Sequence, residues 1–275
     1  MKSKIADYLN LGLNPVAIIW SNDKPDKAIQ HKNGKFACAM HLVAQAAKGK
    51  TVALDGDTSG CFTAAPAFGF GKMEEKFLLD MDYYYAFLSC GMKDVGIDDW
   101  MKELINVAAK LGLAPQDALH MLLEGEGYKK SREVVKEYVD SLPDIQINEK
   151  YVVIKPLKEV DLEKETPVQV VFFVNPNQLS ALIELVNFRT GKSDMVKIGG
   201  GSGCQDIGLL GYQESREENP RAILGFTDLY ARNKLKRIVG KDKFTLTVPM
   251  KLFITMEEDA DESLLVRDTW KKLSA

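Results

Sequence analysis

The order of apolar and amphipathic segments in the first half of the chain is repeated in the second half. Each half opens with an apolar run of strand character, continues with a segment of helical spacing that ends at a glycine, and returns to a short strand. These segments occupy residues 15–20, 36–48 and 51–55 in the first half, and residues 167–174, 178–190 and 195–199 in the second. A further strand that ends at a proline follows in both halves, at Pro156 and at Pro249. Such repetition is typical of a duplicated structural unit.

Between the two copies, residues 96–146 have helical character and no counterpart in the second half. Trp100, Leu104 and Leu111 recur at helical spacing, and Ser131 precedes an amphipathic helix as its N-cap. We therefore predict an α/β fold: two pseudo-symmetric strand-helix-strand halves packed together, with a helical insertion between them. The predicted units are residues 1–95 (first α/β repeat), 96–146 (helical insertion), 147–163 (the strand that completes the first repeat, and a linker), 164–255 (second repeat) and 256–275 (C-terminal helix).

The composition is that of an ordinary globular protein. The 275 residues are 45% hydrophobic and 27% charged, and the net charge of −3 leaves no cationic excess for a nucleic-acid surface. No apolar run approaches the roughly 20 residues of a membrane span, and the N-terminus has no apolar signal region. We expect a cytoplasmic protein that binds neither nucleic acid nor membrane, with an oligomeric state that stays open.

Four widely spaced cysteines do not form a disulfide framework, so we expect reduced thiols or ligands. Cys61 and Cys204 each follow a Ser-Gly pair at the same step of the repeat. A glycine turn after a strand would place each sulfur near a helix N-terminus, where N–H groups and the helix dipole favour the thiolate and lower the thiol pKa. The alternative is that both are small buried apolar residues in a tight turn.

Two further patterns are candidate binding features. Cys38 and His41 are three residues apart in a predicted helix and would present ligand atoms on one face; an incidental polar face is the alternative. The loop before Cys204 lies between a predicted strand and a helix, and its backbone N–H groups are a candidate phosphate cradle. Its residues are Gly199, Gly200, Gly201, Ser202 and Gly203. No P-loop lysine follows, and the spacing is not the dinucleotide fingerprint.

Two other stretches have a simpler interpretation. The aromatic run at residues 83–87 is expected in the core or in a strand, with a tyrosine that faces a cofactor as the alternative. Asp228 and Arg232 are four residues apart, which predicts an ion pair on the surface of a helix.

Several of these features together resemble the DUF169 family of uncharacterised prokaryotic proteins, which are common in anaerobes and archaea. The resemblance covers nearly the whole chain and rests on short motifs. The matching residues are Pro15, Val16, Cys38, Ala46, Gly49, Gly60, Cys61, Pro176, Gln178, Gly203, Cys204, Gly225, Asp228 and Arg232. The resemblance supplies no established activity. It implies that Cys38, Cys61 and Cys204 occupy the family's cysteine positions, whereas Cys90 does not, and that residues 225–232 lack a cysteine that some relatives carry.

Three thiolates in a cytosolic protein of anaerobic type favour an iron–sulfur cluster or another thiophilic metal over a hard cation. We expect the loops of the two halves to meet and to bring Cys38, Cys61 and Cys204 together as metal ligands, for a redox or small-molecule role. The expected partner is a small molecule or a redox partner, and whether the protein is an enzyme stays open. One alternative is a binding protein or enzyme for a phosphate-bearing cofactor, a flavin or a nucleotide, at residues 199–203. Another is a structural protein with buried cysteines.

Overall fold

The computed structural model of the chain describes residues 1–33, 37–76, 81–92, 109 and 123–274. Seven strands form one mixed sheet at its centre. The strands are β1 (Val16–Ser21), β2 (Val52–Leu54), β3 (Tyr151–Pro156), β4 (Gln169–Val174), β5 (Val196–Ile198), β6 (Ala222–Gly225) and β7 (Phe244–Pro249). Their order is β2-β3-β1-β4-β7-β6-β5, and all neighbours are antiparallel except β5 and β6. The predicted α/β class is therefore confirmed.

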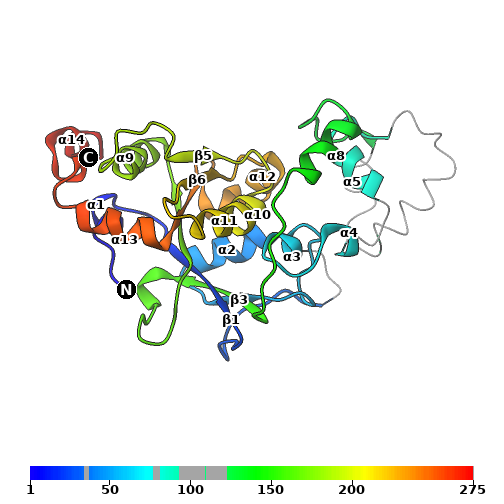
Figure 1. Cartoon of the computed structure of the whole chain (residues 1–275), viewed down its shortest axis with the longest axis horizontal. Coiled ribbons are helices and arrows are strands. Elements are labelled where there is room, and N and C mark those ends of the chain that lie inside the picture. Colours follow the sequence, from blue (N-terminus) through cyan, green and yellow to red (C-terminus); the bar gives the residue numbers. More distant parts are fainter. Residues whose placement is uncertain (34–36, 77–80, 93–108, 110–122, 275) are drawn as a thin grey trace.

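Alternate side chains of a strand point to opposite faces, so these apolar strands supply two cores. The first core contains Ile18 and Phe173, and the second contains Ile19 and Phe172. The first face is covered by α2 (Ala39–Ala47), α3 (Ala64–Ala67), α10 (Gly203–Gln205), α11 (Gly211–Ser215) and α12 (Leu229–Val239). The second face is covered by α1 (Lys4–Tyr8), α9 (Pro176–Val186), α13 (Met250–Asp259) and α14 (Asp268–Ser274). Figure 1 shows the two groups of helices on either side of the strands.

The strands of the two predicted repeats occupy matching positions in the sheet, but the helices that follow them do not lie on the same face. β1 and β4 pair at the centre, β3 and β7 flank them, and β2 and β5 form the edges. The helices that follow β1 and β4, however, lie on opposite faces, because α2 packs in the first core and α9 in the second. The sequence patterns also did not predict β6, which lies between β7 and β5. The equivalence of the two halves stays a prediction.

Within the described part of the predicted insertion, residues 132–140 form a helix, whereas residues 124–131 and 141–146 are turns and irregular segments. The helix α8 (Arg132–Asp140) begins at Ser131, whose hydroxyl accepts a hydrogen bond from the N–H of Val134 at 3.4 Å, as predicted. The predicted helices around Trp100–Leu123 lie mainly outside the described residues. Upstream, α4 (Met73–Lys76) and α5 (Met81–Leu88) follow α3, and α5 packs against α8 around Tyr83 and Val135. The aromatic run is therefore a helix and not a strand.

The C-terminal region also differs from the single helix that we predicted for residues 256–275. The chain passes from α13 through a 3-10 turn (Leu264–Val266) to α14. Trp270 of α14 is buried in the second core, and its indole N–H donates to the carbonyl of Tyr8 at 2.9 Å. This contact holds the C-terminal helix beside α1.

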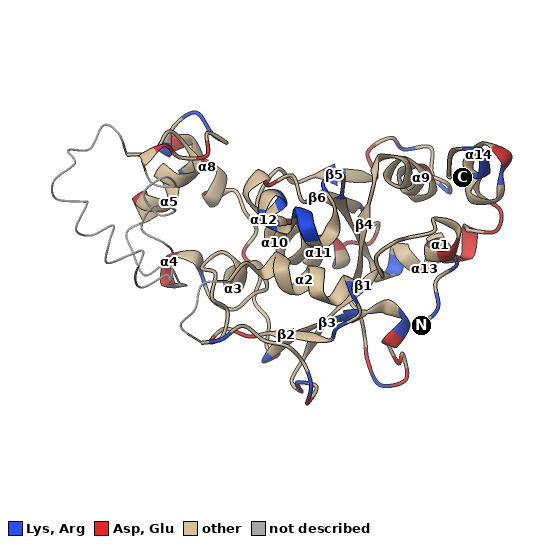
Figure 2. Cartoon of the chain, turned by 180° about the vertical axis from the view of Figure 1, so that it is seen from behind, with Lys and Arg blue, Asp and Glu red and all other residues tan. Residues whose placement is uncertain are grey.

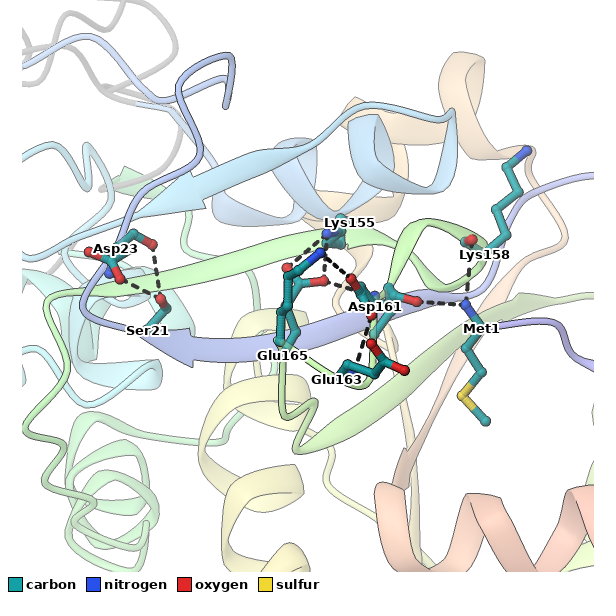
Figure 3. A network of polar contacts seen from close by, with 10 residues as sticks. Met1, Ser21, Asp23, Lys155, Lys158, Asp161, Glu163 and Glu165 are labelled. Carbon is teal, nitrogen blue, oxygen red and sulfur yellow. Dashed lines mark hydrogen bonds and ion pairs between the residues drawn. The ribbon is translucent and has the colours of Figure 1, made fainter.

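A network of polar contacts fixes the connection from β3 to β4, two parallel strands with β1 between them, so that this connection crosses over β1 (Figure 3). Lys155 of β3 donates to both carboxylate oxygens of Glu165 at 2.8 Å, and Glu165 also accepts from the N–H of Asp161 at 3.1 Å. The N-terminal ammonium group donates to the carbonyl of Val160 at 2.7 Å. Elsewhere, Figure 2 shows Lys and Arg interspersed with Asp and Glu over the helices and loops. No helix in the described part of the chain is long and apolar enough to cross a membrane.

Candidate functional site

A cavity of about 90 Å³ lies where α2, α10 and α12 of the first face meet the α5–α8 pair. It is large enough for several water molecules. Cys38, Cys61 and Cys204 all line it. The structure thus brings three thiols from three separate segments of the chain to one place. Cys90 is exposed and is not among the residues that line the cavity.

The hydroxyl of Thr63 joins two of the sulfur atoms. Its Oγ1 atom lies 3.1 Å from Sγ of Cys61 and 3.8 Å from Sγ of Cys204. The sum of these distances is an upper limit for the separation of the two sulfur atoms, so the two Ser-Gly-Cys steps do meet. Ser202 adds a second hydroxyl, whose oxygen lies 3.4 Å from Sγ of Cys204.

The three cysteines nevertheless do not form a ligand cluster as they stand. Among the described residues, no three Cys, His, Asp or Glu side chains are placed to hold one metal ion. The helix α2 begins at Ala39, one residue later than a helical Cys38 would require, and Cys38 is its N-cap with extended backbone. His41 is exposed, and its Nε2 atom lies 3.5 Å from the side-chain nitrogen of Gln45. The expectation that Cys38 and His41 share one helical face is therefore wrong.

The expectation of lowered thiol pKa values is also wrong for the metal-free protein. Burial raises the pKa of Cys61, and it raises the pKa of Cys204 to about 12. The pKa of Cys38 is raised for the same reason, and the neighbouring Cys61 and Cys204 raise it further because like charges oppose each other. The apolar surroundings outweigh the favourable effect of a helix N-terminus, even though Cys204 lies in the first turn of a continuous helical run from Gly203 through the π-helical turn (Asp206–Leu210) to Ser215. All three thiols are protonated near neutral pH.

Asp228 is the carboxylate among the described residues that line the cavity. Its spacing to Arg232 had predicted a surface ion pair instead. It lines the cavity at the start of α12, where its carboxylate accepts from the N–H of Ala231 at 3.1 Å and from the hydroxyl of Tyr128 at 3.4 Å. Burial raises its pKa, and its charge in turn raises the pKa of each of the three thiols. Asp228 is thus coupled electrostatically to the cysteines.

A turn with a strained backbone at Phe226 precedes Asp228 in the chain and places it in the cavity wall. Phe226 is buried and has a φ of 61°, in the left-handed region that a bulky residue rarely adopts. Its N–H donates to the carboxylate of Asp206 at 3.2 Å, and its carbonyl accepts from the guanidinium of Arg232 at 3.1 Å. Arg232 also donates to the carbonyls of Lys241 and Lys243. Asp228 and Arg232 therefore do not form the predicted ion pair. Asp228 lines the cavity, and Arg232 donates hydrogen bonds that hold the turn at Phe226.

The glycines at residues 199–203 allow neighbouring side chains to pack closely against the backbone of this loop. A side chain at position 199 would collide with the carboxylate of Asp206, and one at position 201 with the hydroxyl of Tyr138. The N–H groups of Gly199 and Ser202 already have acceptors, which are the Leu224 carbonyl and the Gln205 side chain. The loop therefore packs around a carboxylate. Four of its five predicted cofactor-binding residues do line the cavity, namely Gly200, Gly201, Ser202 and Gly203.

Aromatic side chains form much of the remaining wall. They come from α5, α8, α12 and the turns before α3 and α8, and are Phe62, Tyr84, Phe87, Tyr128, Tyr138 and Tyr230. The alternative reading of the aromatic run, a tyrosine that faces the site, applies to Tyr84, whose pKa is raised by burial and by nearby acidic groups that include Tyr138 and Cys204.

Taken together, the fold and the cavity define a mixed α/β protein with a buried site lined by thiols and aromatic rings. The model of the DUF169 family, described as "Uncharacterised ArCR", matches residues 4–259, and the chain belongs to this family. No curated protein and no solved structure matches the chain significantly.

Proposed function

We propose that the cavity binds an iron–sulfur cluster or another thiophilic metal through Cys38, Cys61 and Cys204, in a protein with a redox or small-molecule role. The observation that carries the proposal is that three thiols, from segments far apart in the sequence, line one cavity. Thiolates are the ligands that such metals prefer, and an apolar wall shields a cluster from solvent.

The donor chemistry fits such a group, but the positions of the side chains must change on binding. The described residues hold no preformed set of three ligands. The thiols are protonated, so binding would release protons and become tighter as the pH rises. When bound, the metal or cluster would supply electron transfer or a Lewis acid. The protein would supply the sulfur ligands, and Thr63, which contacts both Cys61 and Cys204, would position two of them.

Two alternatives have less support. A phosphate-bearing cofactor at residues 199–203 is favoured by the position of this loop in the cavity wall and by Lys129 nearby. The carboxylate of Asp206 beneath the loop opposes an anion there. A purely structural role for the cysteines is the second alternative. A duplicated origin of the two halves also remains a proposal, supported by the matching strand order and opposed by the placement of α2 and α9.

Anaerobic purification with metal analysis and an absorption spectrum tests the proposal. We expect bound metal in the native chain and in Cys90→Ser, the matched control with an exposed thiol. We expect loss of metal in Cys61→Ser and in Cys204→Ser. Equal metal content in all four proteins, or no metal in any of them after reconstitution with iron and sulfide or with zinc, would reject it. A released flavin or nucleotide would support the phosphate alternative.

A further inference from the structure

Four of the aromatic side chains that line the cavity pack as two edge-to-face pairs. The rings of Phe62 and Tyr84 are 5.3 Å apart with an angle of 82° between their planes. The rings of Phe87 and Tyr230 are 6.3 Å apart at 87°. Rings at right angles form adjoining walls and not a stack, so they can surround a ligand from several sides.

Two tyrosine rings of the cavity wall are each in contact with the ammonium group of a lysine. The ammonium group of Lys129 lies 4.9 Å from the centre of the Tyr138 ring, and that of Lys234 lies 5.4 Å from the centre of the Tyr230 ring. Both distances are within the range of an attractive cation–π contact. Both tyrosines line the cavity, and of the two lysines Lys129 lines it as well, so an ammonium group already contacts an aromatic ring within the cavity wall.

The cavity also contains a carboxylate that forms no ion pair within the described part of the chain, because the ammonium group of Lys129 in the same wall lies over the Tyr138 ring. Asp228 is the carboxylate among the described residues that line the cavity, and in the described part of the chain no Lys, Arg or His forms an ion pair with it. Its hydrogen bonds come from a tyrosine hydroxyl and a backbone N–H, which carry no net charge. A partly buried carboxylate in apolar surroundings gains stability from a bound cation.

We propose that the aromatic side of this cavity binds an organic ammonium ion with a methylated nitrogen, with Asp228 as its countercharge. A methylated ammonium donates few or no hydrogen bonds, so it suits a wall of aromatic rings and thiols better than a primary amine does. The inference rests on the proposed function only in placing the ligand in the same cavity. It deepens that function by naming a class of substrate, and it assigns the cysteines no part in holding the cation.

The test is calorimetric titration with choline and with its neutral analogue 3,3-dimethyl-1-butanol. We expect choline to bind, and the neutral analogue, of the same shape, to bind about tenfold more weakly or not at all. Asp228→Asn and Tyr230→Leu should each weaken choline binding by about tenfold. Lys129→Gln should tighten it, because this change frees the face of Tyr138 from the native ammonium group. Tyr151→Phe, on β3, is the control and should leave binding unchanged.

The arms of the experiment separate this inference from the metal proposal. Cys61→Ser should keep its affinity for choline even where it loses metal, and a metal-free native protein should bind choline as well. Equal affinity for choline and for the neutral analogue would overturn the inference, and so would the absence of choline binding in native protein with an intact cooperative thermal transition. Unchanged choline affinity in Asp228→Asn, confirmed as folded in the same way, would overturn the role of Asp228.

Discussion

At the scale of single residues, the chemistry of the site depends on how acidic groups oppose each other in an apolar space. Three thiols and one carboxylate share the cavity, and each negative charge makes the next one less favourable. The pKa of Cys204, at about 12, follows from burial first and from Cys61 second. The site therefore favours the uncharged thiols until a cation compensates them.

This coupling predicts the effect of Asp228→Asn on the thiols. The carboxylate raises the pKa of all three cysteines, so its removal should lower these pKa values. The rate of thiol modification by methyl methanethiolsulfonate, measured against pH in a Cys90→Ser background, should shift to lower pH. Asp26→Asn, at an exposed position, is the control. A profile that stays in place or moves to higher pH would contradict the coupling.

The sequence predicted that Cys61 and Cys204 lie close together, but it did not predict the ionisation state of the thiols. The Ser-Gly-Cys repeat predicted that Cys61 and Cys204 belong to one region, because a repeated step indicates equivalent structural positions. It could not predict that the surroundings are too apolar for stable thiolates, because the burial of each sulfur atom depends on tertiary packing. Asp228 was missed because its spacing to Arg232 matches a common helical ion pair. The left-handed turn at Phe226, which separates the two, has no signature in the sequence.

At the scale of elements, the wall of the cavity depends on how α8 is attached to the first face. The hydroxyl of Tyr138 donates to the side-chain oxygen of Gln205 in α10 at 3.1 Å. Arg132, at the start of α8, donates to the carbonyl of Gly91 at 3.0 Å. The first contact joins α8 to the cysteine loop, and the second joins it to the end of α5.

Tyr138→Phe tests this attachment, because it removes the hydrogen bond and keeps the ring. A typical hydrogen bond contributes about 0.5–1.5 kcal/mol. We expect the backbone amides of α8 to exchange hydrogen up to about tenfold faster, with little change in β4 and β7, because the loss acts on local opening of α8. Tyr151→Phe serves as the control. Equal acceleration throughout the sheet would mean that Tyr138 contributes to global stability and not to this attachment.

Element types were predicted well where the local signals are strong. Ser131 was predicted as an N-cap, and the structure confirms it. The helix predicted at residues 178–190 begins at Pro176 and ends at Val186, and its start is fixed by a capping box between Asn175 and Gln178 that was not predicted. The aromatic run at 83–87 was expected in the core or in a strand because tyrosine and phenylalanine favour sheets. Packing of α5 against α8 makes it a helix. The short strand β6 carries little pattern of its own in only four residues, so the sequence patterns missed it.

At the scale of the whole molecule, buried polar groups lie between the sheet and the helices of the first face. Asp206 begins a π-helical turn (Asp206–Leu210) and is fully buried. One carboxylate oxygen accepts from Phe226, and the other has no hydrogen-bond partner among the described residues. Burial raises the pKa of Asp206 to about 7, against an ordinary value of 3.8. Such turns often mark functional sites, and here the turn joins the cysteine loop to β6.

This pKa predicts how the stability of the whole protein depends on pH. Between about pH 4 and pH 7 the folded state keeps a proton on Asp206 that the unfolded state has lost, so stability falls as the pH rises through this range. A rise of about three pKa units corresponds to at most about 4 kcal/mol, and we expect a loss of about 2–4 kcal/mol by pH 7.5 relative to Asp206→Asn. Urea unfolding of both proteins across this range measures the difference. His31, whose pKa is lowered by burial, has the opposite pH dependence, but it is present in both chains and cancels. If the difference in stability between the two proteins is constant from pH 4 to pH 7.5, Asp206 is ionised throughout this range. The folded protein would then hold no protonated carboxyl group at this position.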